Sequence, residues 1–504
     1  MTVPAKYVTL SNGALISSKK NADGSRTDTW KMDLPHAPYL FFMGVGDFAI
    51  IKDKYKNKEV NYYVEHEYAS VARKIFGNTP EMIGFFSRIL NYEYPWNKFS
   101  QMVGRDYVSG AMENTTATLH QESAQQDARQ LVDGNAWESV IAHELFHHWF
   151  GDYVTAESWS NLTVNESFAN FSEMLWFTYK YGRDAGDEQN YNELQGYLHS
   201  ESEHKDLVRF YYRDKEDMFD AVSYNKGGRI LNMLRNFLGD SAFFKGINLY
   251  LTTNKFKTGE AHQLRLALEE VSGRDLNWFF NQWYFGSGHP ELDISYAYDD
   301  DKKQVSVSIR QIATGNTLFE LPLAIDIYNG AKKTRHQVWV KGMDQTFVFP
   351  YTTRPDLVNV DGDKVLLCEK KDEKTLENFL HQYKYAGLYL DRREAIDFCA
   401  ENQTRPEALG LLKAALKDKY YGLREYTISR LDLKNPAVRD AVEPILADLA
   451  ANDPKPTVRG AAIGALADYK KSAYQPLFTA AVTDSSYTVA GNALEALAAI
   501  DEVA

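Results

Sequence analysis

The pattern that most constrains this chain is a His-Glu-Leu-Phe-His segment at positions 143–147, followed eighteen residues later by Glu166. Residues four apart on a helix point within about 40° of each other, so His143 and His147 share one face. Two neutral imidazoles and a carboxylate form the open three-ligand set of a catalytic zinc, with water as the fourth ligand. Glu144 stands beside the first ligand, where it can take that water's proton. The sequence therefore predicts a zinc site.

An accidental match is the plain alternative. With 12 histidines in 504 residues, a chance His-Glu-x-x-His segment is of order a few per cent. Glu166 follows at a sequence spacing that lets a second helix return to the metal, and this lowers the probability of a chance match further. We expect residues 136–150 to form the first helix and residues 165–181 the second, which ends at Gly182.

Composition narrows the class of protein. The chain is 44% apolar, enough for a large core split into three or four domains. Its longest apolar stretch, residues 39–51, is too short to span a bilayer. The net charge of −13 and the lack of a basic block argue against nucleic acid as a partner. The two cysteines, Cys368 and Cys399, are expected to be free thiols. Compartment and oligomeric state stay open.

Four regions follow one another along the sequence. Residues 1–36 alternate polar and apolar side chains around two turn signals, as in a hairpin. Residues 37–285 have a mainly helical pattern, and residues 286–370 have the alternation of a small antiparallel β domain. Residues 371–504 are helical again, with a period in the low thirties between 405 and 504. Such spacing favours helix pairs stacked in a solenoid, as in HEAT-like repeats, over a plain helical bundle.

Two further motifs gain meaning beside a zinc ion. Glu113, in a Gly-Ala-Met-Glu-Asn string at positions 110–114, would by itself more often be a solvated surface acid. A carboxylate fixed near the metal can instead pair with a substrate's free α-ammonium, which makes an exopeptidase. Tyr224 opens a helical pattern, and a phenol near the metal can donate to an oxyanion. With 32 tyrosines in the chain, packing is the commoner role for any one of them.

Together these motifs resemble the zinc aminopeptidases related to aminopeptidase N, a family that also includes leukotriene hydrolase. The likeness extends from near residue 5 to about residue 370. The matching strings are residues 110–114, residues 143–151, residues 165–169, residues 224–227, and Trp283 with Gly288-His289-Pro290.

The resemblance implies a fold and a set of roles. The fold is multidomain and mainly α with β: a thermolysin-like catalytic domain over 37–285, a β-sandwich over 286–370 and a helical carboxy-terminal domain over 371–504. His143, His147 and Glu166 would ligate one zinc per chain. Glu144 would act as general base and then as general acid. Tyr224 would stabilise the transition state. Glu113 would hold the substrate's amino terminus, within the segment that also contains Gly110, Ala111, Met112 and Asn114. Glu173 stands where the family often has an acid bonded to a ligand histidine, and ordinary exposure of this side chain is the open alternative.

The sequence also departs from the family. Ser167 stands where the family usually has Gly, and Asp152 where it commonly has Asn; neither is a ligand or a proton carrier. The family carries a whole amino-terminal β domain, of which residues 1–36 resemble only the closing segment. We therefore expect a fragment of a longer enzyme, one that binds zinc and hydrolyses poorly.

The predicted function is a zinc aminopeptidase that hydrolyses peptides with a free amino terminus, a role in peptide catabolism. Three alternatives stay open. An epoxide hydrolase of the leukotriene hydrolase type would use the same motifs. A thermolysin-type endopeptidase is disfavoured by Glu113. A non-catalytic scaffold would use the helical solenoid to bind peptides. The preferred first residue of the substrate cannot be read from the sequence.

Overall fold

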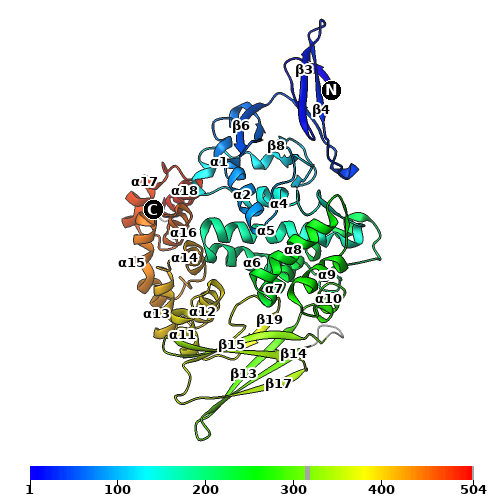
Figure 1. The fold of residues 1–504 in the computed structure, drawn as a ribbon. Coiled ribbons are helices and arrows are strands. Elements are labelled where there is room, and N and C mark those ends of the chain that lie inside the picture. The colour runs from blue at the N-terminus through cyan, green and yellow to red at the C-terminus, as the bar shows by residue number, and fades with distance from the viewer. Residues whose placement is uncertain (313–317, 502–504) are drawn as a thin grey trace.

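The computed structural model describes residues 1–312 and 318–501, and Figure 1 shows its fold. Strands open the chain, helices fill its centre, a second group of strands follows, and helices end the described part. This mixed arrangement confirms the predicted fold class, a multidomain chain that is mainly helical with β-sheets.

The first strands form a hairpin that projects from the rest of the chain at the top of Figure 1. Strands β3 and β4 pair antiparallel around Gly24, whose φ of +82° suits glycine. Strand β2 pairs instead with β5, so it links the hairpin to the following part of the chain. The bounds are β1 (Thr2–Pro4), β2 (Val8–Ser11), β3 (Ala14–Lys20), β4 (Ser25–Lys31) and β5 (Met43–Gly46).

A five-stranded sheet comes next, within the region 37–285 for which the sequence pattern predicted mainly helices. Its order is β6-β7-β8-β10-β9, with β7, β8 and β10 parallel and the two edge strands antiparallel. Strand β8 is buried on both faces and shows no alternation of polar and apolar residues, so its sequence gave no strand signal. The bounds are β6 (Ala49–Tyr55), β7 (Lys58–Val64), α1 (Ala72–Phe76), α2 (Thr79–Ile89), β8 (Lys98–Gly104), β9 (Ala111–Met112), β10 (Ala117–Gln121) and α3 (Gln130–Asp133).

Helices α4 and α5 occupy the centre of the molecule (Figure 1). Helix α4 covers Glu138–Phe146, which is shorter than the predicted 136–150, and His147 is its cap. Helix α5 covers Thr163–Tyr181 and ends at Gly182, as expected; its residues 163–176 are all buried, as in a helix enclosed on every side. No helix in the described part of the chain is long and apolar enough to cross a bilayer.

Further helices and a short strand pair surround α5. The chain passes from α6 through a π-helical turn at Val222–Lys226 directly into α7. The bounds are β11 (Val154–Ala156), α6 (Arg183–Leu198), α7 (Gly227–Leu238), α8 (Asp240–Asn254), β12 (Lys257–Gly259), α9 (Ala261–Ser272) and α10 (Asn277–Trp283).

The second group of strands forms two facing sheets at the bottom of Figure 1, ordered β17-β14-β13-β19 and β16-β15-β18. Every second residue of β14 is buried, as period-two alternation requires. Strand β19 pairs in parallel with β13, so this sheet runs past residue 370. The bounds are β13 (Glu291–Asp299), β14 (Gln304–Ile312), β15 (Leu321–Asn329), β16 (Lys332–Val340), β17 (Asp344–Pro350), β18 (Leu357–Val360) and β19 (Glu369–Asp372).

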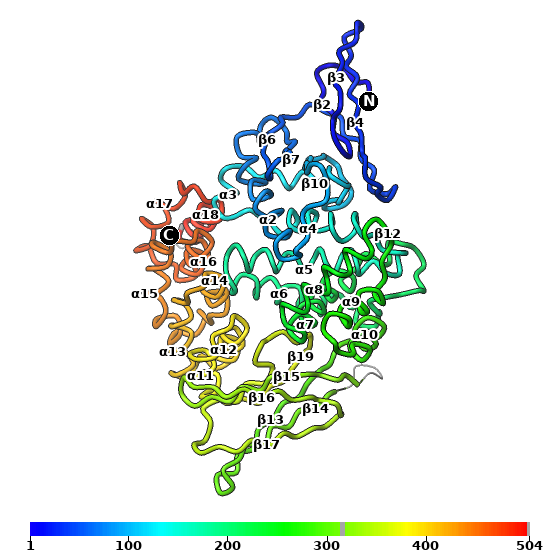
Figure 2. Tube along the Cα trace, in the orientation of Figure 1, coloured from blue at the N-terminus to red at the C-terminus, as the bar shows by residue number. Residues whose placement is uncertain are grey.

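The last helices stack one after another, and α16 and α18 contact α3, the helix that follows the five-stranded sheet (Figure 2). The Asp133 carboxylate, at the end of α3, accepts hydrogen bonds from Ser486 Oγ at 2.5 Å and Thr488 Oγ1 at 2.8 Å. The Arg129 guanidinium lies 4.2 Å from the ring centre of Tyr487. The bounds are α11 (Leu376–Tyr385), α12 (Tyr389–Glu401), α13 (Pro406–Ala415), α14 (Tyr421–Ser429), α15 (Pro436–Asn452), α16 (Pro456–Ala467), α17 (Gln475–Ala481) and α18 (Tyr487–Asp501).

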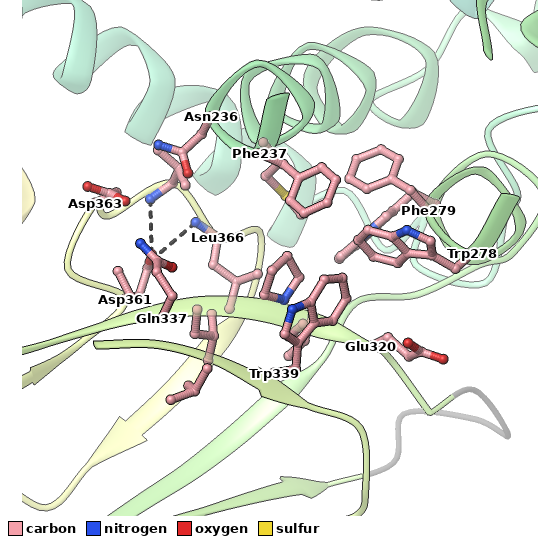
Figure 3. Close-up of a pocket in the computed structure, with 18 of the residues that line it drawn as sticks. Asn236, Phe237, Trp278, Phe279, Glu320, Gln337, Trp339, Asp361, Asp363 and Leu366 are labelled. Carbon is pink, nitrogen blue, oxygen red and sulfur yellow. Dashed lines mark hydrogen bonds between the residues drawn. The ribbon is translucent and has the colours of Figure 1, made fainter. Parts of the chain in front are cut away.

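A cavity of about 550 Å³ lies where α7 and α10 meet the strands β15 and β16 (Figure 3). Three of its aromatic side chains pack against one another, with ring centres 5.0–5.9 Å apart: Phe237, Trp278 and Trp339. None of the residues predicted for the zinc site lines this cavity. The candidate site is therefore built from the helices α4 and α5 instead.

Candidate metal centre

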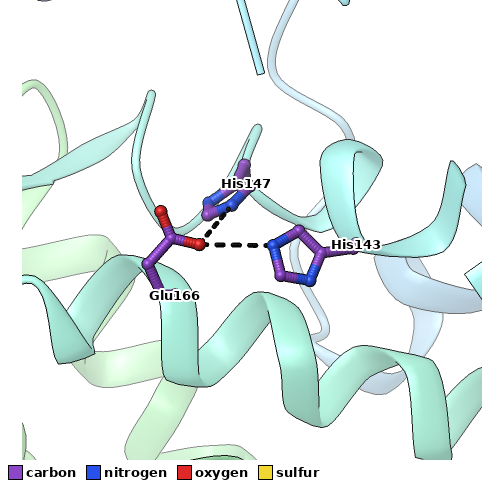
Figure 4. A group of neighbouring side chains, drawn as sticks. All are labelled: His143, His147 and Glu166. Carbon is purple, nitrogen blue, oxygen red and sulfur yellow. Dashed lines mark hydrogen bonds and ion pairs between the residues drawn. The ribbon is translucent and has the colours of Figure 1, made fainter. Parts of the chain in front are cut away.

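Three predicted ligands meet between α4 and α5 (Figure 4). Oε2 of Glu166 lies 3.2 Å from Nε2 of His143 and 3.2 Å from Nε2 of His147. All three side chains are buried. The two histidines come from the last turn and the cap of α4, and Glu166 from the first turn of α5. The helix pair thus brings Glu166 to two histidines that lie 23 and 19 positions before it in the sequence.

The outer nitrogens of both rings have acceptors of their own. Nδ1 of His143 lies 3.0 Å from Oε1 of Glu173, and Nδ1 of His147 lies 2.9 Å from the Phe150 carbonyl oxygen. These acceptors would keep the ring hydrogens on Nδ1 when a metal is bound, which would leave the Nε2 lone pairs free to ligate it. A tetrahedral metal ion with N and O bonds of about 2.0–2.1 Å separates neighbouring ligand atoms by about 3.3 Å. The three donor atoms fit such an ion.

The buried carboxylates of this cluster favour positive charge beside them, as a bound cation would supply. Burial opposes protonation of His147, but Glu166 and Glu113 outweigh burial and raise its pKa to about 9. Burial likewise opposes ionisation of Glu166, yet the two histidines outweigh it and lower the pKa of Glu166. Without a metal, the histidines therefore hold protons to balance the carboxylates. A divalent cation would supply the same positive charge and release those protons.

Glu144 has a free acceptor in the same cluster. Burial raises the pKa of Glu144 to about 8, against the opposing effect of His143 and His147. Its Oε2 atom is buried and has no hydrogen-bond partner among the described residues. A buried acceptor without a donor is costly unless a ligand or water meets it. A cation nearby would favour its carboxylate form.

The Gly110–Asn114 segment lies at the edge of the five-stranded sheet. Ala111 and Met112 form strand β9, which pairs antiparallel with β10. The Gly110 carbonyl accepts from the Gln121 N–H at 2.9 Å, and a side chain at Gly110 would meet no other atom within 4 Å. Asn114 directs its amide towards the carbonyls of residues 40 and 41, at 3.5 and 3.4 Å.

Glu113 follows this strand and points into the cluster. One of its carboxylate oxygens lies within 4.8 Å of a carboxylate oxygen of Glu144 and a ring nitrogen of His147. The phenol of Tyr39 lies 3.5 Å from its Oε1, at the limit of a hydrogen bond. Burial raises the pKa of Glu113, with His147 acting in the opposite direction. Glu113 is thus a buried acid beside the histidines, unlike the surface acid that its sequence context alone would suggest.

A buried turn behind Glu113 contains residues that the sequence reading missed. Thr116 has a φ of +66°, which is rare and strained for a β-branched residue. Four hydrogen bonds hold it there: its N–H donates to His148 Nε2, its carbonyl and its hydroxyl both contact Lys98 Nζ, and its hydroxyl also accepts from the Gly13 N–H. His148 in turn contacts the Glu144 carbonyl through Nδ1 at 3.1 Å. The histidine directly after the motif was the one available signal.

Tyr224 lies over the first ligand. It belongs to the π-helical turn, and its ring is parallel to that of His143, with centres 5.8 Å apart. Burial, together with the charges of Glu166, Glu113 and Glu144, raises the pKa of Tyr224 well above its ordinary value. The phenol therefore keeps its proton and stays a hydrogen-bond donor.

The π-helical turn is fixed from two sides. Oδ1 of Asp220 accepts from the N–H groups of Val222 and Ser223, each at 3.1 Å. The Ser167 hydroxyl donates to the Ser223 carbonyl at 2.6 Å. A Cβ at Gly227 would lie 1.8 Å from the Ser167 Oγ, so this glycine is needed for the close approach of α5 and α7. Ser167, one of the departures from the family pattern, thus holds the segment that carries Tyr224.

Comparisons with known proteins agree with this arrangement. Residues 75–283 match the peptidase family M1 domain, and residues 443–504 match HEAT repeats. The chain is 29% identical over 299 residues to tricorn protease-interacting factor F2 of Thermoplasma volcanium, covering 57% of this chain and 37% of that protein. It is 28% identical over 343 residues to aminopeptidase N of Haemophilus influenzae, covering 64% and 39%. The chain thus spans less than two fifths of these curated relatives.

One solved structure covers almost the whole chain. The crystal structure of Legionella pneumophila aminopeptidase A, in complex with aspartic acid, superposes with a TM-score of 0.82 at 20% sequence identity. It covers 99% of this chain, which matches 67% of that one. At this identity the likeness concerns the fold.

A His-x-x-x-His helix joined by a glutamate from the next helix, in this mixed multidomain fold, defines the metallopeptidase class with the HExxH motif. Within that class, the chain resembles the aminopeptidase N-like peptidases of family M1, whose domain residues 75–283 match.

Proposed function

We propose that this chain carries the active site of a zinc-dependent aminopeptidase, which removes the amino-terminal residue from peptides. The observation that carries the proposal is the position of Glu113, an acid from the sheet edge, within 4.8 Å of Glu144 and His147. An endopeptidase has no need of a buried acid at that place. In the proposal His143, His147 and Glu166 hold one zinc ion. The match of residues 75–283 to the family M1 domain and the names of the relatives support it.

Zinc, when bound, would polarise the scissile carbonyl and lower the pKa of water towards about 7. The protein groups then move the protons. Glu144 accepts a proton from the attacking water and delivers it to the nitrogen of the leaving amine, so no net proton stays on the enzyme. Its unpartnered Oε2 is available for this transfer.

Two side chains would position the substrate. The Glu113 carboxylate pairs with the α-ammonium of the substrate in a charge-assisted hydrogen bond, so that the first peptide bond is the one at the metal. Tyr224 keeps its proton because its pKa is raised, and its hydroxyl donates to the oxyanion that forms as the carbonyl is attacked.

A direct test combines zinc content with turnover. The purified 504-residue chain should bind one zinc and release the chromogenic amine from aminoacyl anilides, with loss of turnover on chelation and recovery on adding zinc. Replacing Glu144→Gln keeps a side chain of the same size, so zinc should stay bound while the rate falls by about 10²–10⁴-fold. Near-normal turnover of this variant would exclude Glu144 as the base. A variant at an exposed acid, Glu157→Gln, is the matched control.

Acetylation of the substrate separates the proposal from an endopeptidase. An N-acetylated peptide lacks the cation that Glu113 would bind, so it should resist cleavage that its free counterpart undergoes. Equal cleavage of the two peptides would favour an endopeptidase of the thermolysin type.

A further inference from the structure

Helix α6 contacts both α5 and the π-helical turn that carries Tyr224. Two of its side chains, Gln189 and Glu193, lie one helical turn apart and face these elements. Neither of them belongs to the sequence motifs of the site. Their hydrogen bonds connect the part of the site that contains His143 with the turn that carries Tyr224. These bonds lie on the side away from the proposed metal.

The first half of this network leads to His143. Gln189 Nε2 lies 3.0 Å from Oε2 of Glu173, whose other oxygen lies 3.0 Å from Nδ1 of His143. The same Nε2 atom lies 2.9 Å from Oε1 of Glu193. One amide thus donates hydrogen bonds to the carboxyl groups of both Glu173 and Glu193 and links them.

The second half leads to Tyr224. Oε2 of Glu193 accepts from Nδ2 of Asn225 at 2.7 Å and from Nδ2 of Asn170 at 2.8 Å. Asn225 is the next residue after Tyr224, so its side chain fixes the turn that presents the phenol. A Cβ at position 196 would lie 2.6 Å from Asn225 Nδ2, and Gly196 leaves that space open.

We propose that Gln189 and Glu193 are positioning residues that hold Glu173, behind His143, and Asn225, beside Tyr224, in one fixed relation. The inference rests on the proposed function for the role of Tyr224, whereas the link to His143 concerns metal binding alone. Partners that orient metal ligands from outside typically change metal affinity or activity 10–100-fold when they are removed. A buried network of hydrogen bonds stabilises one arrangement of side chains only when all its polar groups have partners, so removing one member weakens the whole network.

A purely structural role of α6 is the competing explanation. The helix also bonds to the carboxy-terminal helices: Glu188 accepts from the hydroxyls of Tyr389 at 3.3 Å and Tyr420 at 2.5 Å. Glu188 is next to Gln189 in the sequence, but its side chain faces the carboxy-terminal helices and not α5. The variant Glu188→Gln therefore perturbs α6 without touching the network, and it is the matched control.

The metal arm of the test needs no turnover. Zinc affinity of Gln189→Leu, measured by competition with a chromophoric chelator, should be weaker than that of the unchanged chain by about tenfold or more. The Glu188→Gln control should bind zinc normally. Unchanged zinc affinity of Gln189→Leu overturns the link to His143, whatever the chain hydrolyses.

The second arm is a double-mutant cycle on the catalytic rate. Glu193→Ala should lower kcat by about 10–100-fold with little change in KM. If Glu193 acts through Tyr224, the same change in a Tyr224→Phe background should have almost no further effect. An equal loss in both backgrounds means a general structural role and overturns the proposal.

Should Glu193→Ala not fold, Glu193→Gln keeps its volume and serves in the same cycle. A chain without aminopeptidase activity would refute the proposed function, and the zinc arm alone would then decide the inference.

Discussion

The phenol ring of Tyr224 lies parallel to the imidazole of His143, with ring centres 5.8 Å apart and planes 7° from parallel. The ring and the hydroxyl of Tyr224 therefore have separate tasks: the ring packs on the ligand, and the hydroxyl faces the acids of the site. Replacing Tyr224→Phe keeps the ring and removes only the hydroxyl. We expect kcat to fall by about 10²–10³-fold, the loss typical of one oxyanion donor, with KM changed little. Steady-state kinetics on an aminoacyl anilide measures both.

Zinc content and melting temperature are the controls for this variant, and both should match the unchanged chain. A rise in KM with kcat unchanged would mean that the hydroxyl binds the substrate as strongly as it binds the transition state. Unchanged kcat and KM would remove Tyr224 from the mechanism altogether.

The carboxylate of Glu173 lies behind His143, with Oε1 3.0 Å from Nδ1. Glu173→Gln keeps an acceptor oxygen but removes the negative charge that makes the imidazole a better donor to a metal. We expect zinc affinity to fall by about tenfold, and Glu173→Leu to lower it more because the ring hydrogen then loses its acceptor. Isothermal titration with zinc tests this order; equal affinities of all three proteins would contradict it.

Short motifs made the centre of the site predictable. The spacing of His143, His147 and Glu166 lets a second helix return to the first, and the structure brings these three side chains together. Glu173 was left undecided between a bond to a histidine and exposure, because the sequence does not show which face of α5 is enclosed. The structure places it 3.0 Å from His143.

The supporting residues were not predictable for a different reason. Long-range hydrogen bonds connect Lys98, Thr116 and Glu193 to partners that lie between 18 and 103 positions away. No periodicity encodes such contacts. The sheet of β6–β10 was missed as well, because β8 is buried on both faces and lacks alternation.

Buried Lys98 gives the stability of the chain a pH dependence of known sign. Burial lowers the pKa of Lys98 from 10.5 to about 7, with Glu59 weakly opposing this. Between these two values the unfolded chain binds a proton at Lys98 that the folded chain does not. The free energy of unfolding therefore rises with pH from about 7 to about 10.5, by at most about 1.4 kcal/mol per pH unit. Below pH 7 both states are protonated and this dependence disappears.

The variant Lys98→Met isolates this effect. It removes the titrating amine together with the hydrogen bonds that this amine donates to the Ser11 and Thr116 carbonyls, so the variant should be less stable by an offset that does not depend on pH. We therefore expect the difference between the unchanged chain and Lys98→Met to grow in favour of the unchanged chain from pH 7 to pH 9.5. Urea unfolding at several pH values measures it, and a flat difference would show that Lys98 stays charged in the folded chain.

The close approach of α5 and α7 limits what position 227 can hold. A Cβ at Gly227 would lie 1.8 Å from Oγ and 2.6 Å from Cβ of Ser167. Gly227→Ala should therefore destabilise the chain by about 1–3 kcal/mol, as overpacking of a core does. It should also lower kcat, because the turn that carries Tyr224 ends directly before residue 227.

The double variant Gly227→Ala with Ser167→Gly removes both clashing atoms, so it should recover part of the stability. Urea unfolding of the four proteins measures the coupling. Independent, additive losses would show that the two helices separate to make room, and kcat of the double variant would then stay as low as that of Gly227→Ala.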